Sequence, residues 1–505
     1  MPGPASILRI EALRAIEAAD AEHGLMERAG AAAAALAEKI CKSGGRPILI
    51  VAGPGNNGGD AMVVARLLHE RTIACHLVLA GDEALLPADA QKAWQKFLAA
   101  GGTVHRDFPN GQRWDLVIDG LFGVGLKREI DGAYAELIER LQDAARHSGC
   151  PLLALDCPSG LDADTGSRRG ATIVATHTIS FLGLKPGLLT ADGPDCCGEI
   201  SVADLAATWP ALPAAACGQR VGPSEFRGLL KARPRNSHKG SFGAAGILGG
   251  APGMVGAALL AGRAALKLGA GRVYLGFPGE PPLPVDPGQP ELMLRDADNF
   301  FAAPLTALAC GPGLGLGQSG AARALLDRAI AAPQPLVLDA DALNLLGSDA
   351  TLAEAVRQRA ASTVLTPHPG EAARLLGSGI DAVQSDRLAA ASRLATRYQT
   401  WIVLKGCGSI VVSPDGNWWI NSTGNAGLAS AGSGDVLSGF LAALLAAGHS
   451  TADAVLAATW LHGAAADALV GADPATGPIG LTASELPNAA RSLLNQLIEP
   501  TATTA

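Results

Sequence analysis

Short apolar runs alternate with longer stretches of helical periodicity through the first part of the chain. Many of the helical stretches are rich in alanine, and glycine or polar residues follow several of the apolar runs. Strands that alternate with helices form a parallel, doubly wound sheet. The expected strands are residues 47–51, 73–79, 116–118, 152–155 and 178–181, and the expected helices are residues 7–40, 61–70, 87–100 and 133–147.

The same alternation resumes in the second part, after a break between residues 208 and 223. Pro210, Pro213 and a run of alanines predict a linker there. At 505 residues the chain exceeds a typical single domain, so we expect two, residues 1–217 and 218–505. The second domain is predicted to have strands at 245–248, 272–275, 308–310, 336–338, 364–366, 401–404 and 410–413, and helices at 254–268, 374–376, 386–398, 436–447 and 452–470.

Composition and charge exclude several classes of protein. The net charge is −8, from 47 acidic and 39 basic residues, with no lysine or arginine stripe, so no nucleic-acid partner is expected. No apolar segment reaches ~18 uninterrupted residues, and no signal-peptide pattern begins the chain, so no membrane partner is expected. Nine cysteines without a Cys-x-x-Cys pair predict free thiols, Cys196 and Cys197 included, and a cytoplasmic location.

The segment Gly432-Ser433-Gly434-Asp435 is the most informative in the chain. Glycines at the start of a helix leave backbone N–H groups free to hold an anion, and the helix dipole favours an anion there. A carboxylate beside a bound phosphate can take the proton from a hydroxyl that receives a phosphoryl group. The segment therefore predicts a nucleotide-using enzyme that acts on a substrate hydroxyl, with Asp435 as the base.

Other predicted strands of the second domain also end in polar or glycine-rich segments. Lys405 ends an apolar strand before two nearby glycines, which suits a phosphate, although a surface lysine is the alternative interpretation. A lone histidine is more often structural, but prolines on both sides of His368 fix its loop and present the ring.

In the first domain, three predicted strands end in polar loops. One loop contains Asn56 and Asn57, whose amides could hold a cation or a sugar; a simple connecting turn is the alternative. Asp119 and Asp156 end the other two strands, where an isolated aspartate is often only a helix cap. Because the carboxyl ends of parallel strands form the binding crevice, we expect the three loops to meet there.

The segments GPGNNGGD, DGLFGVGLKRE and DCPSGLDADTG resemble the N-terminal domain of the NAD(P)H-hydrate epimerases, over roughly residues 7–210. The resemblance implies a potassium ion held by Asn57, Asp119 and Ser159, and a catalytic Asp156. Ala61 stands where the family usually has a glycine, and its methyl group could narrow the approach of a phosphate. The implied substrate-binding residues are Asn56, Asn57, Gly58, Gly59, Asp60, Gly123, Val124, Gly125, Leu126, Lys127, Arg128, Glu129 and Asp156.

Six ordered segments of the second domain resemble the ADP- or ATP-dependent NAD(P)H-hydrate dehydratases, which have a ribokinase-like fold, over roughly residues 225–490. These segments are HKG, GGAPGMVGA, GPGLG, TPHPGE, KGCGS and GNAGLASAGSGDVLSG. The resemblance implies that the hydrated dinucleotide lies against Ala251, Gly315, His368 and Asp435. It implies that the adenine nucleotide is held by Lys405, Gly406, Cys407, Gly408, Ser409 and Gly434.

Together the two resemblances predict a bifunctional enzyme that repairs hydrated NADH and NADPH. A Rossmann-like epimerase would interconvert the R and S hydrates with the help of K⁺. A ribokinase-like dehydratase would convert the S hydrate to NAD(P)H with ADP or ATP, and Mg²⁺ would neutralise the transferring phosphoryl group.

Two alternatives remain open at this point. One is a small-molecule kinase of the ribokinase superfamily, such as a hydroxymethyl-pyrimidine or thiazole kinase, fused to a regulatory domain. The other is a first domain that binds ligand without catalysis. The choice of ADP over ATP, the preference between the two hydrates, communication between the sites and assembly into a homo-oligomer are left open as well.

Overall fold

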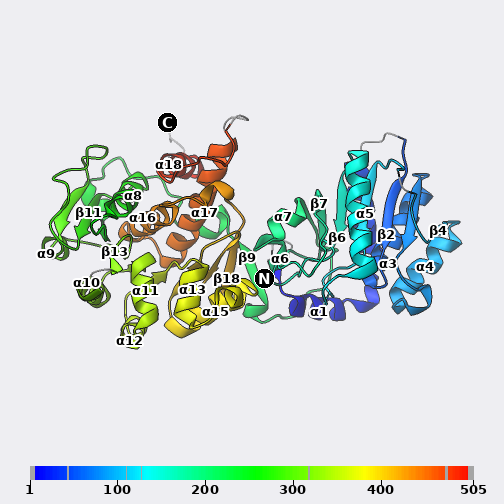
Figure 1. The fold of residues 1–505 in the computed structure, drawn as a ribbon, viewed down its shortest axis with the longest axis horizontal. Coiled ribbons are helices and arrows are strands. Elements are labelled where there is room, and N and C mark those ends of the chain that lie inside the picture. Colours follow the sequence, from blue (N-terminus) through cyan, green and yellow to red (C-terminus); the bar gives the residue numbers. More distant parts are fainter. Residues whose placement is uncertain are drawn as a thin grey trace. The chain divides into compact units, whose positions relative to one another are not determined.

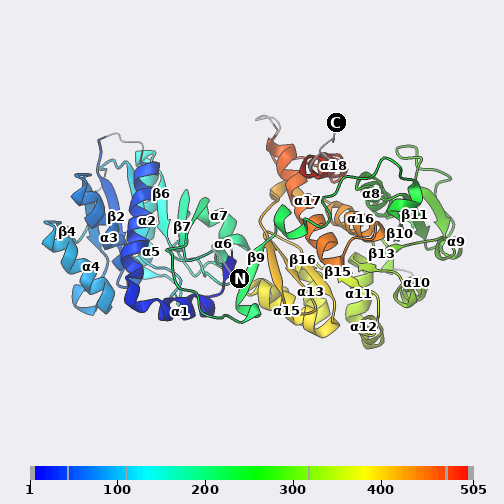
Figure 2. The same cartoon turned by 180° about the vertical axis from the view of Figure 1, so that it is seen from behind.

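The computed structural model describes residues 6–41, 45–109, 111–126, 128–316, 319–471 and 476–498. It has two compact units, and the division falls between Gln219 and Arg220 (Figure 1, and from behind in Figure 2). The stretch expected to be a linker contains strand β9 (Cys217–Arg220), which pairs antiparallel with β1 (Ser6–Leu8). The prediction of a helix from residue 7 is therefore wrong at its start, because this pairing fixes residues 6–8 as a buried strand.

The first unit contains a sheet with the strand order β4-β3-β2-β5-β6-β7-β8, and every neighbouring pair is parallel. Strands β2, β5 and β6 are adjacent, so the three predicted polar loops leave the same edge. The strands are β2 (Ile48–Ala52), β3 (Cys75–Leu79), β4 (Val104–His105), β5 (Leu116–Gly120), β6 (Leu152–Leu155), β7 (His177–Phe181) and β8 (Glu199–Ala203). The helices are α1 (Ile10–Ala19), α2 (Leu25–Ile40), α3 (Asn56–Glu70), α4 (Ala88–Ala99), α5 (Gly132–Ser148), α6 (Pro186–Leu189) and α7 (Gly193–Cys197).

Helices cover both faces of this sheet. Ile48 and Ile50 of β2 face a core shared with α2, α3 and α4, whereas Leu49 and Val51 face a core shared with α5. Figure 1 shows α5 in front of the sheet, and Figure 2 shows α2 in front of its other face. Side chains alternate across a strand, so both faces of a strand covered on two sides must be apolar. The apolar run is therefore continuous, as predicted for a doubly wound sheet.

In the second unit the strands follow the order β12-β11-β10-β13-β14-β15-β16-β17-β18, parallel from β12 to β16 and antiparallel from β16 to β18. The strands are β10 (Ala244–Leu248), β11 (Arg272–Phe277), β12 (Met293–Asp296), β13 (Ala307–Cys310), β14 (Leu336–Leu338), β15 (Thr363–Leu365), β16 (Trp401–Leu404), β17 (Ser409–Val412) and β18 (Trp418–Asn421). The helices are α8 (Val255–Lys267), α9 (Ala297–Phe301), α10 (Ser319–Ala331), α11 (Ala340–Ser348), α12 (Ala350–Arg357), α13 (Pro369–Leu376), α14 (Ile380–Gln384), α15 (Arg387–Tyr398), α16 (Ser433–Ala446), α17 (Thr451–Gly471) and α18 (Leu486–Leu497).

Helices α8, α16 and α17 share an apolar core. Gly439 of α16 lies so close to α8 that an added Cβ would be 2.1 Å from the Ala261 carbonyl oxygen. Among the described residues, α17 is the one helix long and apolar enough to cross a membrane by length and composition. Of its most apolar window, 61% is buried inside the unit, and a core helix passes the same test.

Candidate active sites

The first candidate site begins at the connection between β2 and α3. The helix starts at Asn56, five residues before the predicted start, so residues 56–60 lie in its first turns and not in a loop. An added Cβ on Gly58 would be 2.0 Å from the Gly53 carbonyl oxygen, and one on Gly59 would be 2.5 Å from Met26. These two glycines allow the backbone and a neighbouring side chain to pack closely.

The site also contains a buried carboxylate. Asp119 is fully buried at the end of β5, and its Oδ1 accepts a hydrogen bond of 2.6 Å from the Ser159 hydroxyl. Its Oδ2 accepts from the backbone N–H of Ser159 at 2.9 Å. Burial raises the pKa of Asp119 to about 6, although these hydrogen bonds act in the opposite direction. A cation would stabilise the charged form of this carboxylate.

Asn57 supplies buried polar atoms that lack a partner. Its side chain is 8% exposed, and neither Oδ1 nor Nδ2 has a hydrogen-bond partner among the described residues. An added Cβ on Gly123 would be 3.3 Å from Asn57 Oδ1, and the neighbouring N–H of Phe122 donates to the Ser159 hydroxyl at 2.8 Å. Amide, hydroxyl and carboxylate oxygens thus flank one short segment, and they are the donors that a hard cation prefers. The residues fit a potassium ion.

A cavity of about 1160 Å³ lies beside these residues; Asn57, Phe122 and Gly123 line it, whereas Asp119 and Ser159 do not. Of the predicted substrate-binding residues, Gly58, Gly59 and the exposed Glu129 do not line it, and Lys127 lies outside the described residues. Those that line it are Asn56, Asn57, Asp60, Gly123, Val124, Gly125, Leu126, Arg128 and Asp156.

Ala61 is buried and does not line the cavity. An added Cβ on Gly120 would be only 2.5 Å from the Ala61 methyl carbon, so the missing side chain of Gly120 provides the room that this methyl group occupies. The methyl group therefore lies against Gly120 and not in the cavity.

Asp156 follows β6 in a left-handed backbone conformation, with φ 64°. Such a conformation is uncommon for a residue other than glycine and is concentrated at functional sites. The carboxylate forms an ion pair with Lys185, whose side chain is completely buried. Burial raises the pKa of Asp60 well above its usual range, and the negative charge of Asp156 adds to this effect. The carboxyl groups that line the cavity thus include Asp60 and Asp156, which lie in different environments.

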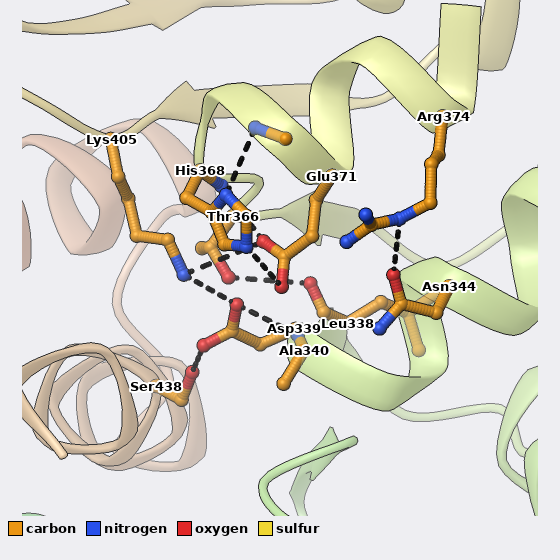
Figure 3. A network of polar contacts seen from close by, with 11 residues as sticks. Leu338, Asp339, Ala340, Asn344, Thr366, His368, Glu371, Arg374, Lys405 and Ser438 are labelled. Carbon is orange, nitrogen blue, oxygen red and sulfur yellow. Dashed lines mark hydrogen bonds and ion pairs between the residues drawn. The ribbon is translucent and has the colours of Figure 1, made fainter. Parts of the chain in front are cut away.

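The second candidate site lies at the ends of β14, β15 and β16, close to the start of α16 (Figure 3). Lys405 Nζ donates to Asp339 Oδ1 at 2.7 Å and lies 3.9 Å from Glu371 Oε2. The hydroxyl of Ser438, on α16, donates to Asp339 Oδ2 at 2.8 Å. Burial raises the pKa of Glu371 to about 7, although Lys405 acts in the opposite direction. The predicted phosphate ligand Lys405 is therefore already paired with a carboxylate.

Asp435 lies in the first turn of α16, which begins after Gly432 in a left-handed conformation, with φ 88°. An added Cβ on Gly434 would be 3.3 Å from Lys405 Nζ and 3.7 Å from Asp339 Oδ2. The group formed by Lys405, Asp339, Glu371 and Ser438, called the lysine cluster below, therefore lies at the start of this helix. Burial and then the charge of Asp339 raise the pKa of Asp435 to about 6, while Lys405 acts against them. A carboxyl group with this pKa can accept and return a proton near neutral pH.

The other predicted substrate residues of the second unit fall into two places. Ala251 and Gly315 are in contact, since an added Cβ on Gly315 would be 2.7 Å from the Ala251 methyl carbon. His368 caps α13, because its Nδ1 accepts from the N–H of Gly370 at 3.0 Å and its own N–H donates to Glu371 at 2.8 Å. The His368 ring remains half exposed beside the lysine cluster.

The loop of residues 405–408 connects β16 to β17, which begins at Ser409. Gly406, with φ 143°, lies over the guanidinium of Arg387, which would be 2.7 Å from an added Cβ. Cys407 is exposed, and the Ser409 hydroxyl donates to the Gly406 carbonyl oxygen at 3.1 Å. The structure brings Lys405 of this loop to Gly434.

Three site residues escaped the sequence reasoning. Lys185, Ser438 and Arg387 lie inside apolar or helical patterns, and nothing local marks Ser438 or Arg387 as functional. Lys185 alone carried a usable signal, because a lysine between an apolar strand and a proline-glycine pair can be buried only when it is paired.

Two α/β units, each with buried carboxylates where parallel strands end, define a two-domain enzyme. A model of the NAD(P)H-hydrate dehydratase family matches residues 245–485, and a model of the YjeF-related protein N-terminus matches residues 22–187. A bifunctional NAD(P)H-hydrate repair enzyme of Escherichia coli K12 is 39% identical over 95% of this chain and 90% of its own length. Another, of Coxiella burnetii, is 36% identical over 95% of this chain and 96% of its own length.

The chain belongs to the family of bifunctional NAD(P)H-hydrate repair enzymes, as its motifs predict. Among solved structures, it is similar to an ADP/ATP-dependent NAD(P)H-hydrate dehydratase from Bacillus subtilis that was co-crystallised with ATP and Mg²⁺. That protein is 33% identical, with a TM-score of 0.49, and the match covers 55% of this chain and 98% of the other.

Proposed function

We propose that this chain repairs hydrated NADH and NADPH in two steps. The first unit interconverts the R and S hydrates, and the second unit converts the S hydrate to NAD(P)H with ADP or ATP. The observation that carries the proposal is the presence, in a member of this family, of two separate sites that each place carboxyl groups where parallel strands end.

The first unit would bind the dinucleotide in the cavity that Asn57 and Asp156 line. Exchange of epimers requires a bond at the hydroxyl-bearing carbon to break and to form again on the opposite face. Asp156 would take the hydroxyl proton and return it, so the net proton count does not change. Asn57, Asp119 and Ser159 would hold K⁺, which supplies positive charge beside the reacting hydroxyl. The buried side-chain amide of Asn57, which has no hydrogen-bond partner among the described residues, supports this role.

In the second unit, Asp435 would take the proton from the hydroxyl of the S hydrate as that oxygen receives the terminal phosphoryl group of the nucleotide. Hydroxide is a poor leaving group, whereas phosphate is a good one. Loss of phosphate and of a ring proton restores the double bond. The N–H groups at the start of α16 would orient the phosphates, and Mg²⁺ would neutralise their charge. Ala251, Gly315 and His368 would contact the dinucleotide, and residues 405–409 with Gly434 the nucleotide.

The fate of the R and S epimers, together with the formation of NADH, distinguishes this function from the two alternative functions. The purified protein is incubated with chemically hydrated NADH, first alone and then with Mg²⁺ and ADP or ATP, while chromatography separates the two epimers. We expect R and S to equilibrate without nucleotide, and both to disappear once nucleotide is added. A protein that consumed only S, with no exchange faster than the spontaneous rate, would have a first unit that only binds ligand. A protein that transferred phosphoryl groups without forming NADH would be a kinase.

All nine cysteines are free thiols, including the adjacent Cys196 and Cys197. Free thiols suit a reducing compartment, and we place the reaction in the cytoplasm, where NAD(P)H is used. The partners that the proposal needs are the hydrated dinucleotide and an adenine nucleotide. Neither site requires nucleic acid or a membrane, and assembly into a homo-oligomer remains open.

A further inference from the structure

Lys185 is a fully buried lysine beside the proposed epimerase site. It directly precedes α6, all four residues of which are buried, and its side chain is 0% exposed. Lysine is almost never fully buried unless it is paired, because an ammonium that leaves water loses several kcal/mol of hydration. A lysine in this position therefore requires a specific set of acceptors.

The three donors of the ammonium group are matched by three acceptors. Nζ forms an ion pair with Asp156 Oδ1, donates to the Ser180 hydroxyl at 2.9 Å, and donates to the Phe181 carbonyl oxygen at 3.0 Å. An ammonium group has three donors and no acceptor, so its hydrogen-bonding capacity is complete. A fully used ammonium cannot easily turn toward a substrate, but it can hold the carboxylate that it touches.

The two oxygens of the Asp156 carboxylate differ: Oδ1 contacts protein donors, whereas Oδ2 accepts no hydrogen bond from a described protein group. Its Oδ1 faces Lys185 and lies 3.4 Å from the N–H of Phe181, and its own N–H donates to Ile179 at 2.7 Å. In the described part of the chain, Oδ2 accepts no hydrogen bond from a protein group. An added Cβ on Gly123 would be 3.2 Å from this Oδ2, so the open oxygen faces the cavity next to Asn57.

We propose that Lys185 is the positioning residue of the epimerase site, which fixes the Asp156 carboxylate by Oδ1 so that Oδ2 faces the substrate hydroxyl. The inference rests on the proposed function. Lys185 acts through Asp156 and does not touch the substrate. The strained backbone of Asp156, whose φ is 64°, is consistent with a carboxylate that its surroundings force into one direction. The proton path is unchanged: Asp156 takes the hydroxyl proton and returns it.

The test uses the full-length protein without nucleotide, so that only epimer exchange is observed. Lys185→Met keeps the aliphatic chain and removes the charge. We expect kcat for exchange to fall by about 10²-fold, the size of a general-base contribution, while KM changes by less than about threefold. Arg169→Met is the matched control. It removes an ion pair of 2.7 Å between Arg169 and Asp162, which lies a few residues after Asp156 in the sequence, and neither residue lines the cavity.

A double-mutant cycle separates positioning from general stability. If Lys185 acts only through Asp156, then Lys185→Met in an Asp156→Asn protein should change kcat by less than about threefold. Additive losses would overturn the inference, as would a wild-type kcat in Lys185→Met. If Lys185→Met does not fold, Lys185→Gln, whose amide can still donate to Ser180 and Phe181, carries the same expectations. Dehydration of the S hydrate by the second unit reports on folding.

The failure of this inference differs from the failure of the proposed function. If the wild-type protein does not exchange epimers faster than the spontaneous reaction, the epimerase function itself is wrong. If the wild type exchanges them and Lys185→Met does so equally well, only the positioning role is wrong.

Discussion

Dehydration of the S hydrate is expected to decline below about pH 6, because the base Asp435 must be ionised to accept a proton. Burial is the main cause that raises the pKa of Asp435 to about 6, and the negative charge of Asp339 is the second. Below that pH, kcat should fall about tenfold per pH unit, as for a single required base. Replacing Asp339 by Asn removes the like charge and keeps one acceptor oxygen for Lys405, while the amide NH2 can donate to the Ser438 hydroxyl.

The direction of the shift in Asp339→Asn follows from the charges. Loss of a neighbouring negative charge favours the ionised form of Asp435. The acidic limb of the profile of kcat against pH should therefore move to lower pH. A like charge a few ångströms away contributes on the order of 1–2 kcal/mol in a partly solvated site, and one pH unit corresponds to about 1.36 kcal/mol. We therefore expect the limb to move down by about one unit, because burial of Asp435 is unchanged.

The assay follows the return of the nicotinamide absorbance from purified S hydrate, at saturating nucleotide and Mg²⁺, between pH 4.5 and 8, a range chosen to span the pKa of about 6. Asp286→Asn is the matched control, since Asp286 is buried and paired with Arg263 at 2.6 Å instead of with the lysine cluster. Its limb should stay at the wild-type pH. An acidic limb that does not move in Asp339→Asn, or that moves upward, would refute the electrostatic account of Asp435.

Three further outcomes are expected. Asp435→Asn should lower kcat for S-hydrate dehydration by about 10²-fold or more, with epimer exchange unchanged; a near-wild-type rate would exclude Asp435 as the base. Asp119→Ala should abolish epimer exchange and its dependence on K⁺ but leave S-hydrate dehydration intact, and parallel loss of both in a folded protein would contradict the separation of the sites. Gly58→Ala should destabilise the first unit by about 1–3 kcal/mol, seen as a lower Tm, because its Cβ would be 2.0 Å from the Gly53 oxygen. Gly55→Ala, with no atom within 4 Å of the added Cβ, is the control, and equal Tm values would rule out the packing explanation.

Local patterns of the sequence determined much of the fold. The strands at 152–155, 336–338 and 401–404 have the observed bounds, because each is a short apolar run buried on both faces of a sheet. Glycines and polar residues that interrupt the apolar and helical patterns were equally visible in the sequence. Glycines at the start of α16 and polar residues at strand ends identified the family, since such segments depend on neighbouring residues in the chain.

Only the tertiary structure decided which residues meet. Ile7 and Leu8 look helical by periodicity, yet pairing with β9, some 210 residues away, makes them part of a strand. The ion pair between Lys185 and Asp156 spans 29 residues, and the one between Lys405 and Asp339 spans 66. Ala61 faces Gly120 and not the cavity because of how α3 packs on β5. Periodicity shows which face of an element is buried, but contacts between distant segments depend on how the elements pack, which no local pattern contains.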